Sequence, residues 1–451
     1  MKKLERRAVL CLLLVVVLVA GLIFFIFKLE KNGGTWASFY ANEHVYSHGN
    51  LCVGAVYDRN GKLLLKNTKQ GPEYNDDSQI RKATFHCVGD QGNNVATGAV
   101  TAFKSKMIGY NFVTGTAGLL KNSGRKIYLT IDAQINRTAY EALAGRKGYV
   151  AVYNWKSGDI VCMVSTPTMD QTSSNDGNVE SGTYINKVLS ACFTPGSTFK
   201  LVTTAAAIDN MEDLNAWQFT CTGSFEIEGE KVTCKYPHGT VDLYGALAKS
   251  CNCAYASLTT ELGSDVMNEY VKKLGLTDSY SVNGIKTKAG SFDFEDAKIN
   301  LGWAGIGQYK DQVNPLSMMV YVGAIAGNGT AAKPEILAGS TVIEKGLSKM
   351  KERGAGGISL LSEGTALQIR EMMRNNVVET YGDNNFPGLE LHAKSGTAEV
   401  GKGLPPNALF VGFSGDYAFA VCVESGGAGA TAAGPVANKV LQDMKAAGYL
   451  S

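Results

Sequence analysis

The feature that most restricts how this chain can fold is an unbroken run of apolar or small residues from Ala8 to Phe27. At a rise of about 1.5 Å per residue, a helix of this length spans roughly the 30 Å hydrocarbon core of a bilayer. Lysines and arginines precede the run and mixed charges follow it, so the positive-inside rule predicts a cytoplasmic tail over residues 1–7. A cleaved signal peptide is the alternative, but the run is too long and no Ala-x-Ala site follows. We therefore predict a single-pass membrane anchor over residues 8–27, with the rest of the chain extracellular.

The remainder of the chain has the composition of a globular protein. Its sequence of 451 residues is 45% hydrophobic, which is ample for large cores, and its length allows about three domains. The formal net charge is only +2 and no long block of Lys or Arg is present, so no nucleic-acid partner is expected. The ten cysteines are unevenly spaced, which indicates buried thiols rather than a compact disulfide framework.

Two cysteines are an exception to this expectation. Cys221 and Cys234 flank residues 225–232, which are predicted to form a β-hairpin that would bring the two thiols together. We therefore predict a disulfide between Cys221 and Cys234. A zinc site that adds His238 is the alternative, but no Cys-x-x-Cys pair supports it. No metal or other cofactor is expected.

The extracellular part divides into a tether, a small domain and a large domain. Residues 28–52 are predicted to be a tether. Residues 53–125 are predicted to be a small irregular α+β domain with a hairpin that turns at Asn60-Gly61. The large domain is predicted over residues 126–451.

The large domain begins and ends with predicted strands, and helices lie between them. Its predicted strands cover residues 126–132, 148–153, 159–164, 389–394, 408–413 and 417–423, and its helices cover residues 133–144, 242–274 and 436–447. Residues 330–359 are predicted to be a surface hairpin and loop. Helices inserted between the first and last strands of one sheet predict an α/β (α+β) fold with an antiparallel sheet flanked by helices.

A candidate nucleophile lies at the start of a predicted buried helix. Pro195-Gly196 breaks the chain and the run after Lys200 is apolar, so Ser197 is predicted to open a helix buried on nearly all sides. Residues three apart share a helix face at about 5–6 Å between Cβ atoms, so Lys200 would reach the Ser197 hydroxyl. Burial, the helix dipole and any nearby cation would lower the pKa of Lys200 and supply a neutral base. Ser-x-x-Lys also occurs at Ser123 and Ser348, where charged surroundings indicate ordinary surface.

Two further motifs follow Ser197 in chain order. Ser250-Cys251-Asn252 ends a predicted helical stretch, where a helix cap is the ordinary explanation for the serine. Lys394-Ser395-Gly396-Thr397 follows a predicted strand whose edge could face a cleft, whereas the other Lys-Ser-Gly, at residues 156–158, is best explained as a turn. Each motif is a weak signal alone. The three in this order, with the first on an apolar helix, indicate one active site.

In these motifs the chain resembles the penicillin-binding proteins, which carry Ser-x-x-Lys, Ser-x-Asn and Lys-Ser/Thr-Gly elements. The likeness covers about Gly54 to the C terminus and is greatest to the class B, monofunctional transpeptidases. It implies the transpeptidase fold shared with serine β-lactamases, together with an N-terminal transmembrane helix and a small N-terminal domain. Tyr309 and Asn314 depart from the family pattern, which affects local loop geometry and not the chemistry. Other segments similar to family landmarks are residues 126–132, 184–187, 305–308 and 410–413.

The resemblance also implies a role for each motif residue. Ser197 would attack the carbonyl between two D-alanines of a peptidoglycan stem peptide, with Lys200 as its base, and a covalent acyl-enzyme would form. Ser250 would pass a proton to the departing D-alanine, Asn252 would hold the substrate amide, and Lys394 would supply positive charge. The backbone N–H groups of Ser197 and Thr397 would stabilise the oxyanion. The implied substrate-binding residues are Ser395, Gly396 and Thr397.

Other functions are compatible with parts of this pattern. A membrane-anchored serine β-lactamase or β-lactam sensor would share the three motifs, but no Glu-x-x-Leu-Asn element follows Ser250, and the nearest candidate, residues 212–215, precedes it. A non-catalytic wall-binding scaffold would not need the intact serine, lysine and asparagine set. A bifunctional enzyme with its own glycosyltransferase lacks room between Lys28 and Lys126. The resemblance thus implies a transpeptidase inhibited by penicillin and other β-lactams, whose partner is a polytopic glycosyltransferase of the shape, elongation, division and sporulation (SEDS) family.

Overall fold

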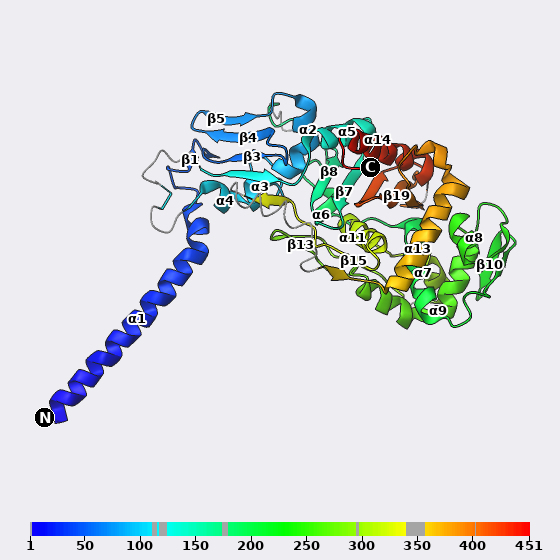
Figure 1. Ribbon diagram of the computed structural model, residues 1–451, viewed down its shortest axis with the longest axis horizontal. Helices are drawn as coiled ribbons and strands as arrows, with labels where there is room; N and C mark the ends of the chain where they lie inside the picture. The colour runs from blue at the N-terminus through cyan, green and yellow to red at the C-terminus, as the bar shows by residue number, and fades with distance from the viewer. Residues whose placement is uncertain are drawn as a thin grey trace.

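The computed structural model describes residues 2–110, 115–116, 124–173, 179–294, 297–339, 357–401 and 403–451. Helix α1 (Lys2–Ala37) projects from the body of the molecule as a single rod, with the N terminus at its far end (Figure 1). Within the described ranges it is the one helix that is long and apolar enough to cross a membrane. The helix continues to Ala37, so the first part of the predicted tether is helical and not extended chain.

A five-stranded sheet organises the region that follows α1. Its order is β16-β6-β3-β4-β5, and β3 and β4 form the hairpin predicted at Asn60-Gly61. Strand β6 pairs in parallel with β3, and β16, from much later in the chain, pairs with the other side of β6. The division predicted between residues 125 and 126 therefore runs through this sheet. The strands are β3 (Ala55–Tyr57), β4 (Leu63–Thr68), β5 (Gly71–Tyr74), β6 (Lys126–Leu129) and β16 (Leu337–Gly339), and the nearby elements are β1 (Tyr46–Ser47), β2 (Asn50–Leu51), α2 (Ser78–Val88), α3 (Ala99–Ala102) and α4 (Lys104–Ile108).

A second five-stranded sheet forms the centre of the larger region. Its order is β18-β19-β20-β7-β8, and each neighbouring pair is antiparallel. The first C-terminal strand begins at His392 and not at residue 389, so the Lys394–Thr397 motif lies inside β18 instead of after the strand. The strands are β7 (Gly148–Asn154), β8 (Ile160–Thr166), β18 (His392–Ala398), β19 (Asn407–Ser414) and β20 (Tyr417–Val423).

Helices cover both faces of this central sheet. Successive residues of a strand point to opposite sides, so each strand contributes side chains to both helical layers. Val150 of β7 packs into a core shared with α5 and α14, whereas its neighbour Ala151 packs into the core that contains α7 and α11. The predicted antiparallel sheet flanked by helices is confirmed. These four helices are α5 (Ala133–Leu143), α7 (Lys200–Asn210), α11 (Pro315–Ala326) and α14 (Gly429–Ala446).

The predicted helical region over residues 242–274 is present as two helices, α8 and α9. They are separated at Ser250, and Gly263 has non-helical dihedral angles within α9. The other elements of this half are α6 (Lys187–Ser190), η1 (Gly196–Thr198), α8 (Leu243–Ala248), α9 (Asn252–Lys273), β13 (Ser281–Val282), β14 (Ile285–Lys286), α10 (Lys298–Ala304), α13 (Glu363–Asn376), η2 (Val377–Tyr381) and η3 (Asp383–Asn385).

The hairpin predicted between Cys221 and Cys234 is present, but the predicted disulfide is contradicted, because both cysteines are free thiols. Cys234 Sγ lies 3.8 Å from Cys251 Sγ and 3.5 Å from Cys253 Sγ. The chain leaving the hairpin packs against the start of α9, which brings the Cys234 thiol close to the thiols of Cys251 and Cys253. The hairpin strands are β10 (Ser224–Ile227) and β11 (Glu230–Thr233), and they are flanked by the paired strands β9 (Phe219–Cys221) and β12 (Gly239–Val241).

The ends of the hairpin predicted over residues 330–359 are present. Strand β15 (Thr330–Ala331) pairs antiparallel with β17 (Ile358–Ser359). The loop predicted between them lies outside the described residues, as do Ser123 and Ser348 of the two alternative Ser-x-x-Lys motifs.

Candidate active site

Ser197 lies in η1, a single 3-10 turn directly before α7. The preceding Gly196 has a φ of 52°, and a Cβ at this position would lie 2.6 Å from the carbonyl oxygen of Thr397. Only glycine therefore allows η1 to approach β18 this closely. The Gly196 N–H also donates to the Gly307 carbonyl oxygen at 2.8 Å, which fixes the turn from the other side. The half-buried Ser197 is thus held beside β18.

Lys200, in the first turn of α7, is fully buried and makes three hydrogen bonds through its Nζ atom. It donates to the Ser250 carbonyl oxygen at 2.7 Å, to Ser250 Oγ at 3.3 Å and to Asn252 Oδ1 at 2.8 Å. The break between α8 and α9 makes these contacts possible, because Ser250 takes a φ of 52° there and turns the chain toward Lys200. Lys200 of the first motif therefore contacts both Ser250 and Asn252 of the second, as the prediction of one active site requires.

Lys394 approaches the same serine from β18. Its Nζ atom is fully buried with the rest of the side chain and donates to Ser250 Oγ at 3.0 Å and to the Ser395 carbonyl oxygen at 3.0 Å. The Ser250 hydroxyl consequently lies between the amines of Lys200 and Lys394. A hydroxyl in this position can accept a proton from one neighbour and donate one to another.

Burial lowers the pKa of both lysines. It lowers the pKa of Lys200 to about 8, although the nearby thiols of Cys251, Cys234 and Cys253 act in the opposite direction. Burial, and then the charge of Lys200, lower the pKa of Lys394 well below its usual value. A lowered pKa makes the neutral amine more available near neutral pH, and the neutral amine is the form that can remove a proton from a serine hydroxyl.

The other residues of the Lys394 motif line the same edge of the sheet. Gly396 lies close to η1, because a Cβ there would be 2.9 Å from the Pro195 carbonyl oxygen. Thr397 is exposed, and its carbonyl oxygen accepts a hydrogen bond from Gln308 Nε2 at 3.3 Å. The strand therefore presents an open polar edge beside Ser197.

Sequence reasoning missed Tyr381, which holds Ser395 in place. The Tyr381 hydroxyl accepts a hydrogen bond from the Ser395 N–H at 2.8 Å and donates one to Ser395 Oγ at 3.0 Å. The Tyr381 ring packs edge-on against Phe410 with ring centroids 5.4 Å apart. No motif includes Tyr381, because it comes from η2 and reaches β18 only through the tertiary fold.

The sequence is similar to known proteins over most of its length. Residues 148–442 match the family model described as the penicillin binding protein transpeptidase domain. The peptidoglycan D,D-transpeptidase PbpA of Mycobacterium tuberculosis is 25% identical over 356 residues, which cover 71% of this chain and 72% of that protein.

Solved structures share the architecture. Penicillin-binding protein A from M. tuberculosis, as a ceftriaxone acyl-enzyme complex, superposes with a TM-score of 0.71 at 21% identity, covering 86% of this chain and 97% of that one. A chain of the complex between penicillin-binding protein PBP2 and MreC from Helicobacter pylori superposes with a TM-score of 0.63 at 19% identity, covering 72% of this chain and 65% of that one. These likenesses confirm the predicted fold.

Proposed function

This chain belongs to the penicillin-binding protein transpeptidase family, and from that premise we propose that it is a class B peptidoglycan D,D-transpeptidase with Ser197 as its nucleophile. The enzyme crosslinks stem peptides through a serine acyl-enzyme during cell wall synthesis and is inhibited by β-lactams. The observation that supports the assignment most strongly is the meeting of two buried lysines at one serine hydroxyl, Ser250 Oγ.

In the first half-reaction Ser197 Oγ attacks the carbonyl carbon between two D-alanines. Lys200, as the neutral amine, takes the hydroxyl proton while the new C–O bond forms. The backbone N–H groups of Ser197 and Thr397 stabilise the oxyanion, at about 2.7–4 kcal/mol per donor in other enzymes. The C–N bond then breaks, Ser250 delivers a proton to the leaving D-alanine, and an ester to Ser197 remains.

The second half-reaction reverses these roles with an amine acceptor from another stem peptide. The acceptor nitrogen attacks the ester, loses a proton through the same groups, and releases Ser197. Asn252 holds the donor amide in this proposal; its Oδ1 accepts a hydrogen bond from Lys200 at 2.8 Å and its Nδ2 donates to the Thr233 carbonyl oxygen at 3.0 Å. Lys394 supplies positive charge, and Ser395, Gly396 and Thr397 bind the terminal carboxylate from the edge of β18.

The test is covalent labelling by a fluorescent penicillin. Wild-type protein should be labelled at Ser197, and Ser197→Ala should abolish labelling while its melting temperature stays close to that of wild type. A matched control is Ser395→Ala, which removes another hydroxyl of the site and should slow labelling without abolishing it. Peptide mapping of the label to any serine other than Ser197 would contradict the assignment.

The lifetime of the acyl-enzyme separates this function from the membrane-anchored β-lactamase. No deacylating Glu-x-x-Leu-Asn element follows Ser250 in the sequence, so the penicilloyl group should remain attached far longer than one turnover of a β-lactamase. Rapid hydrolysis of many β-lactam molecules by each enzyme would favour the β-lactamase.

The domain that carries this site works outside the cell membrane and close to its surface. Helix α1 is the membrane anchor, residues 1–7 lie in the cytoplasm, and the region built around the sheet β16-β6-β3-β4-β5 lies between the anchor and the transpeptidase domain. The apolar side chains of α1 are exposed to the surroundings of the protein, as a lipid-facing helix requires. The partner is a SEDS-family glycosyltransferase, which would supply the new glycan strands that this enzyme crosslinks.

A further inference from the structure

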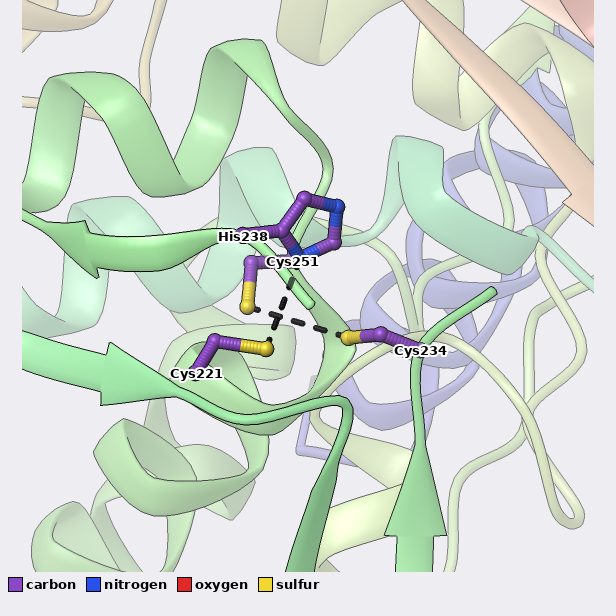
Figure 2. Close-up of side chains that lie close together, drawn as sticks. All are labelled: Cys221, Cys234, His238 and Cys251. Carbon is purple, nitrogen blue, oxygen red and sulfur yellow. Dashed lines mark hydrogen bonds between the residues drawn. The ribbon is translucent and has the colours of Figure 1, made fainter. Parts of the chain in front are cut away.

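Four side chains outside the hydrogen-bond network of the two lysines converge on one point. Cys221 ends β9, Cys234 follows β11, His238 precedes β12, and Cys251 lies between Ser250 and Asn252 (Figure 2). Their ligand atoms, three sulfurs and one imidazole nitrogen, all lie within 4.8 Å of one another. Figure 2 shows that the Cys221–His238 contact crosses the Cys234–Cys251 contact. Segments separate in sequence therefore deliver one compact set of donor atoms.

The spacing of these atoms fits a tetrahedron around a metal ion. With Zn–S bonds of about 2.3 Å and Zn–N bonds of about 2.0 Å, two sulfur ligands lie about 3.8 Å apart and a sulfur and a nitrogen about 3.5 Å apart. Cys234 Sγ and Cys251 Sγ are 3.8 Å apart, and Cys221 Sγ and His238 Nδ1 are 3.5 Å apart. Both distances match the edges of such a tetrahedron.

Backbone N–H groups point at two of the sulfurs, an arrangement that suits thiolates, the ligand form of cysteine. Cys234 Sγ accepts hydrogen bonds from the N–H groups of Asn252 at 3.2 Å and Cys253 at 3.5 Å, and Cys251 Sγ accepts one from Ala254 at 3.4 Å. These donors belong to the first turn of α9, where the helix dipole also favours negative charge. Cys253 is a neighbour and not part of the four, because its Sγ donates to the Val232 carbonyl oxygen at 3.5 Å.

We propose that Cys221, Cys234, His238 and Cys251 bind one Zn²⁺ ion in a closed structural site. Four protein ligands leave no open position for a reacting water, so the ion serves architecture and not acid–base chemistry. Binding converts the three thiols to thiolates and releases their protons, and His238 binds through Nδ1 of its neutral ring. This site departs from the expectation, drawn from the sequence, that no metal is bound.

The ion ties the β9–β12 segment to the second catalytic motif. Cys251 is a ligand between Ser250, whose φ of 52° is strained for a serine, and Asn252. The Asn252 N–H contacts the ligand sulfur of Cys234, while its side chain accepts from Lys200. Zinc therefore positions Ser250 and Asn252 against Lys200, and this part of the inference rests on the proposed function.

The first experiment measures bound metal. Full-length protein should be purified in detergent under reducing conditions and its zinc measured by mass spectrometry, with about one ion expected per chain. Cys221→Ser and His238→Ala should each lower the zinc content at least about ten-fold. The matched control is Cys192→Ser, which changes a partly buried cysteine outside the cluster and should keep the wild-type zinc content. Co²⁺ exchanged into wild-type protein should give the charge-transfer and d–d absorption of a tetrahedral thiolate site.

A second measurement uses wild-type protein alone and so does not depend on the folding of the variants. A chelator should remove the zinc and slow acylation by penicillin at least about ten-fold, and added Zn²⁺ should restore the rate. Wild-type protein that neither contains zinc nor takes up added Zn²⁺ would overturn the site, as would a disulfide among these cysteines in the reduced preparation. Unchanged acylation after zinc removal would overturn its positioning role. Protein that holds zinc but never reacts with penicillin would refute the proposed function and leave the metal site standing.

Discussion

At the scale of single residues, the shared position of Ser250 determines where protons can move. Its hydroxyl contacts both Lys200 and Lys394, at 3.3 Å and 3.0 Å. Two ammonium groups in one buried site repel each other strongly, because little solvent screens them. One lysine can therefore remain charged only if the other is readily deprotonated. Burial lowers the pKa of Lys200 to about 8, and burial together with the charge of Lys200 lowers the pKa of Lys394 well below its usual value.

The lowered pKa of Lys200, about 8, predicts how acylation depends on pH. In the proposed mechanism the neutral amine of Lys200 is the base, so the acylation rate should rise by about ten-fold per pH unit below this pKa and level off above it. The measurement is the second-order rate of labelling by a fluorescent penicillin from about pH 6 to about pH 9.5. Lys200→Arg keeps a positive charge throughout this range and should react slowly at every pH. A wild-type rate that is flat across the range would show that Lys200 does not act as the base.

Tyr381→Phe should impair catalysis while leaving the fold intact. The phenylalanine ring keeps the packing against Phe410, but the Ser395 N–H and hydroxyl lose their partner. An unpaired N–H costs about 1–3 kcal/mol, so Ser395 should become less well positioned and the acylation rate should fall about ten-fold. Tyr381 is a positioning residue that acts mainly through the Ser395 N–H, and Ser395→Ala keeps this bond, so Tyr381→Phe should lower the rate in that background too. A Tyr381→Phe enzyme that acylates at the wild-type rate would contradict this role.

At the scale of elements, the close approach of η1 to β18 forms the site. Gly196 and Gly396 permit it, since a Cβ at Gly196 would lie 2.6 Å from the Thr397 carbonyl oxygen and one at Gly396 would lie 2.9 Å from that of Pro195, the residue before η1. This approach also explains why Pro195-Gly196 breaks the chain before the nucleophile: the break both starts the helix and removes the side chain that would separate Ser197 from Thr397.

Gly196→Ala should therefore damage the site more than the fold. Its positive φ and the contact at 2.6 Å to the Thr397 oxygen should lower the free energy of unfolding by about 1–3 kcal/mol. Displacement of Ser197 should lower the acylation rate about a hundred-fold. The matched control is Gly229→Ala, which also has a positive φ but no atom within 4 Å of its new Cβ, and should lose stability without losing acylation. A Gly196→Ala enzyme with the wild-type rate would show that the approach of η1 to β18 is not required.

The elements that could be predicted from the sequence are those whose signal is local. The strands β7 and β20, the capped helix α5 and the break at Gly196 each follow from periodicity or a cap within a few residues. The parallel pairing of β3 with β6, the addition of β16 and the contact of Tyr381 with Ser395 join distant segments, so no local pattern reports them. The prediction of a Cys221–Cys234 disulfide was wrong for the same reason. The hairpin was predicted correctly, but Cys251, brought in by α9, changes the environment of Cys234.

At the scale of the whole molecule, helix α1 and the candidate active site lie far apart (Figure 1). Helix α1 extends away from the body, and its last residues pack onto the N-terminal region, where Gly33 lies against the ring of Tyr110. The central sheet with its catalytic motifs belongs to the opposite part of the molecule (Figure 1). Contacts with a membrane partner can therefore form through α1 and residues 53–125 without any change at Ser197.

This separation predicts that partner binding and catalysis can be changed independently. In the test chimera, an unrelated transmembrane helix replaces residues 8–27 and unrelated side chains replace the surface residues of the N-terminal region. This chimera should lose copurification with the proposed SEDS polymerase. Its rate of labelling by penicillin should stay within about two-fold of wild type, because the η1–β18 contact and both lysines are untouched. The matched control is Ser197→Ala, which should lose labelling and keep the polymerase. If the chimera still copurified with every polymerase of this family at the wild-type level, the anchor and N-terminal region would not carry the interface. The contact would then have to lie on the transpeptidase domain itself.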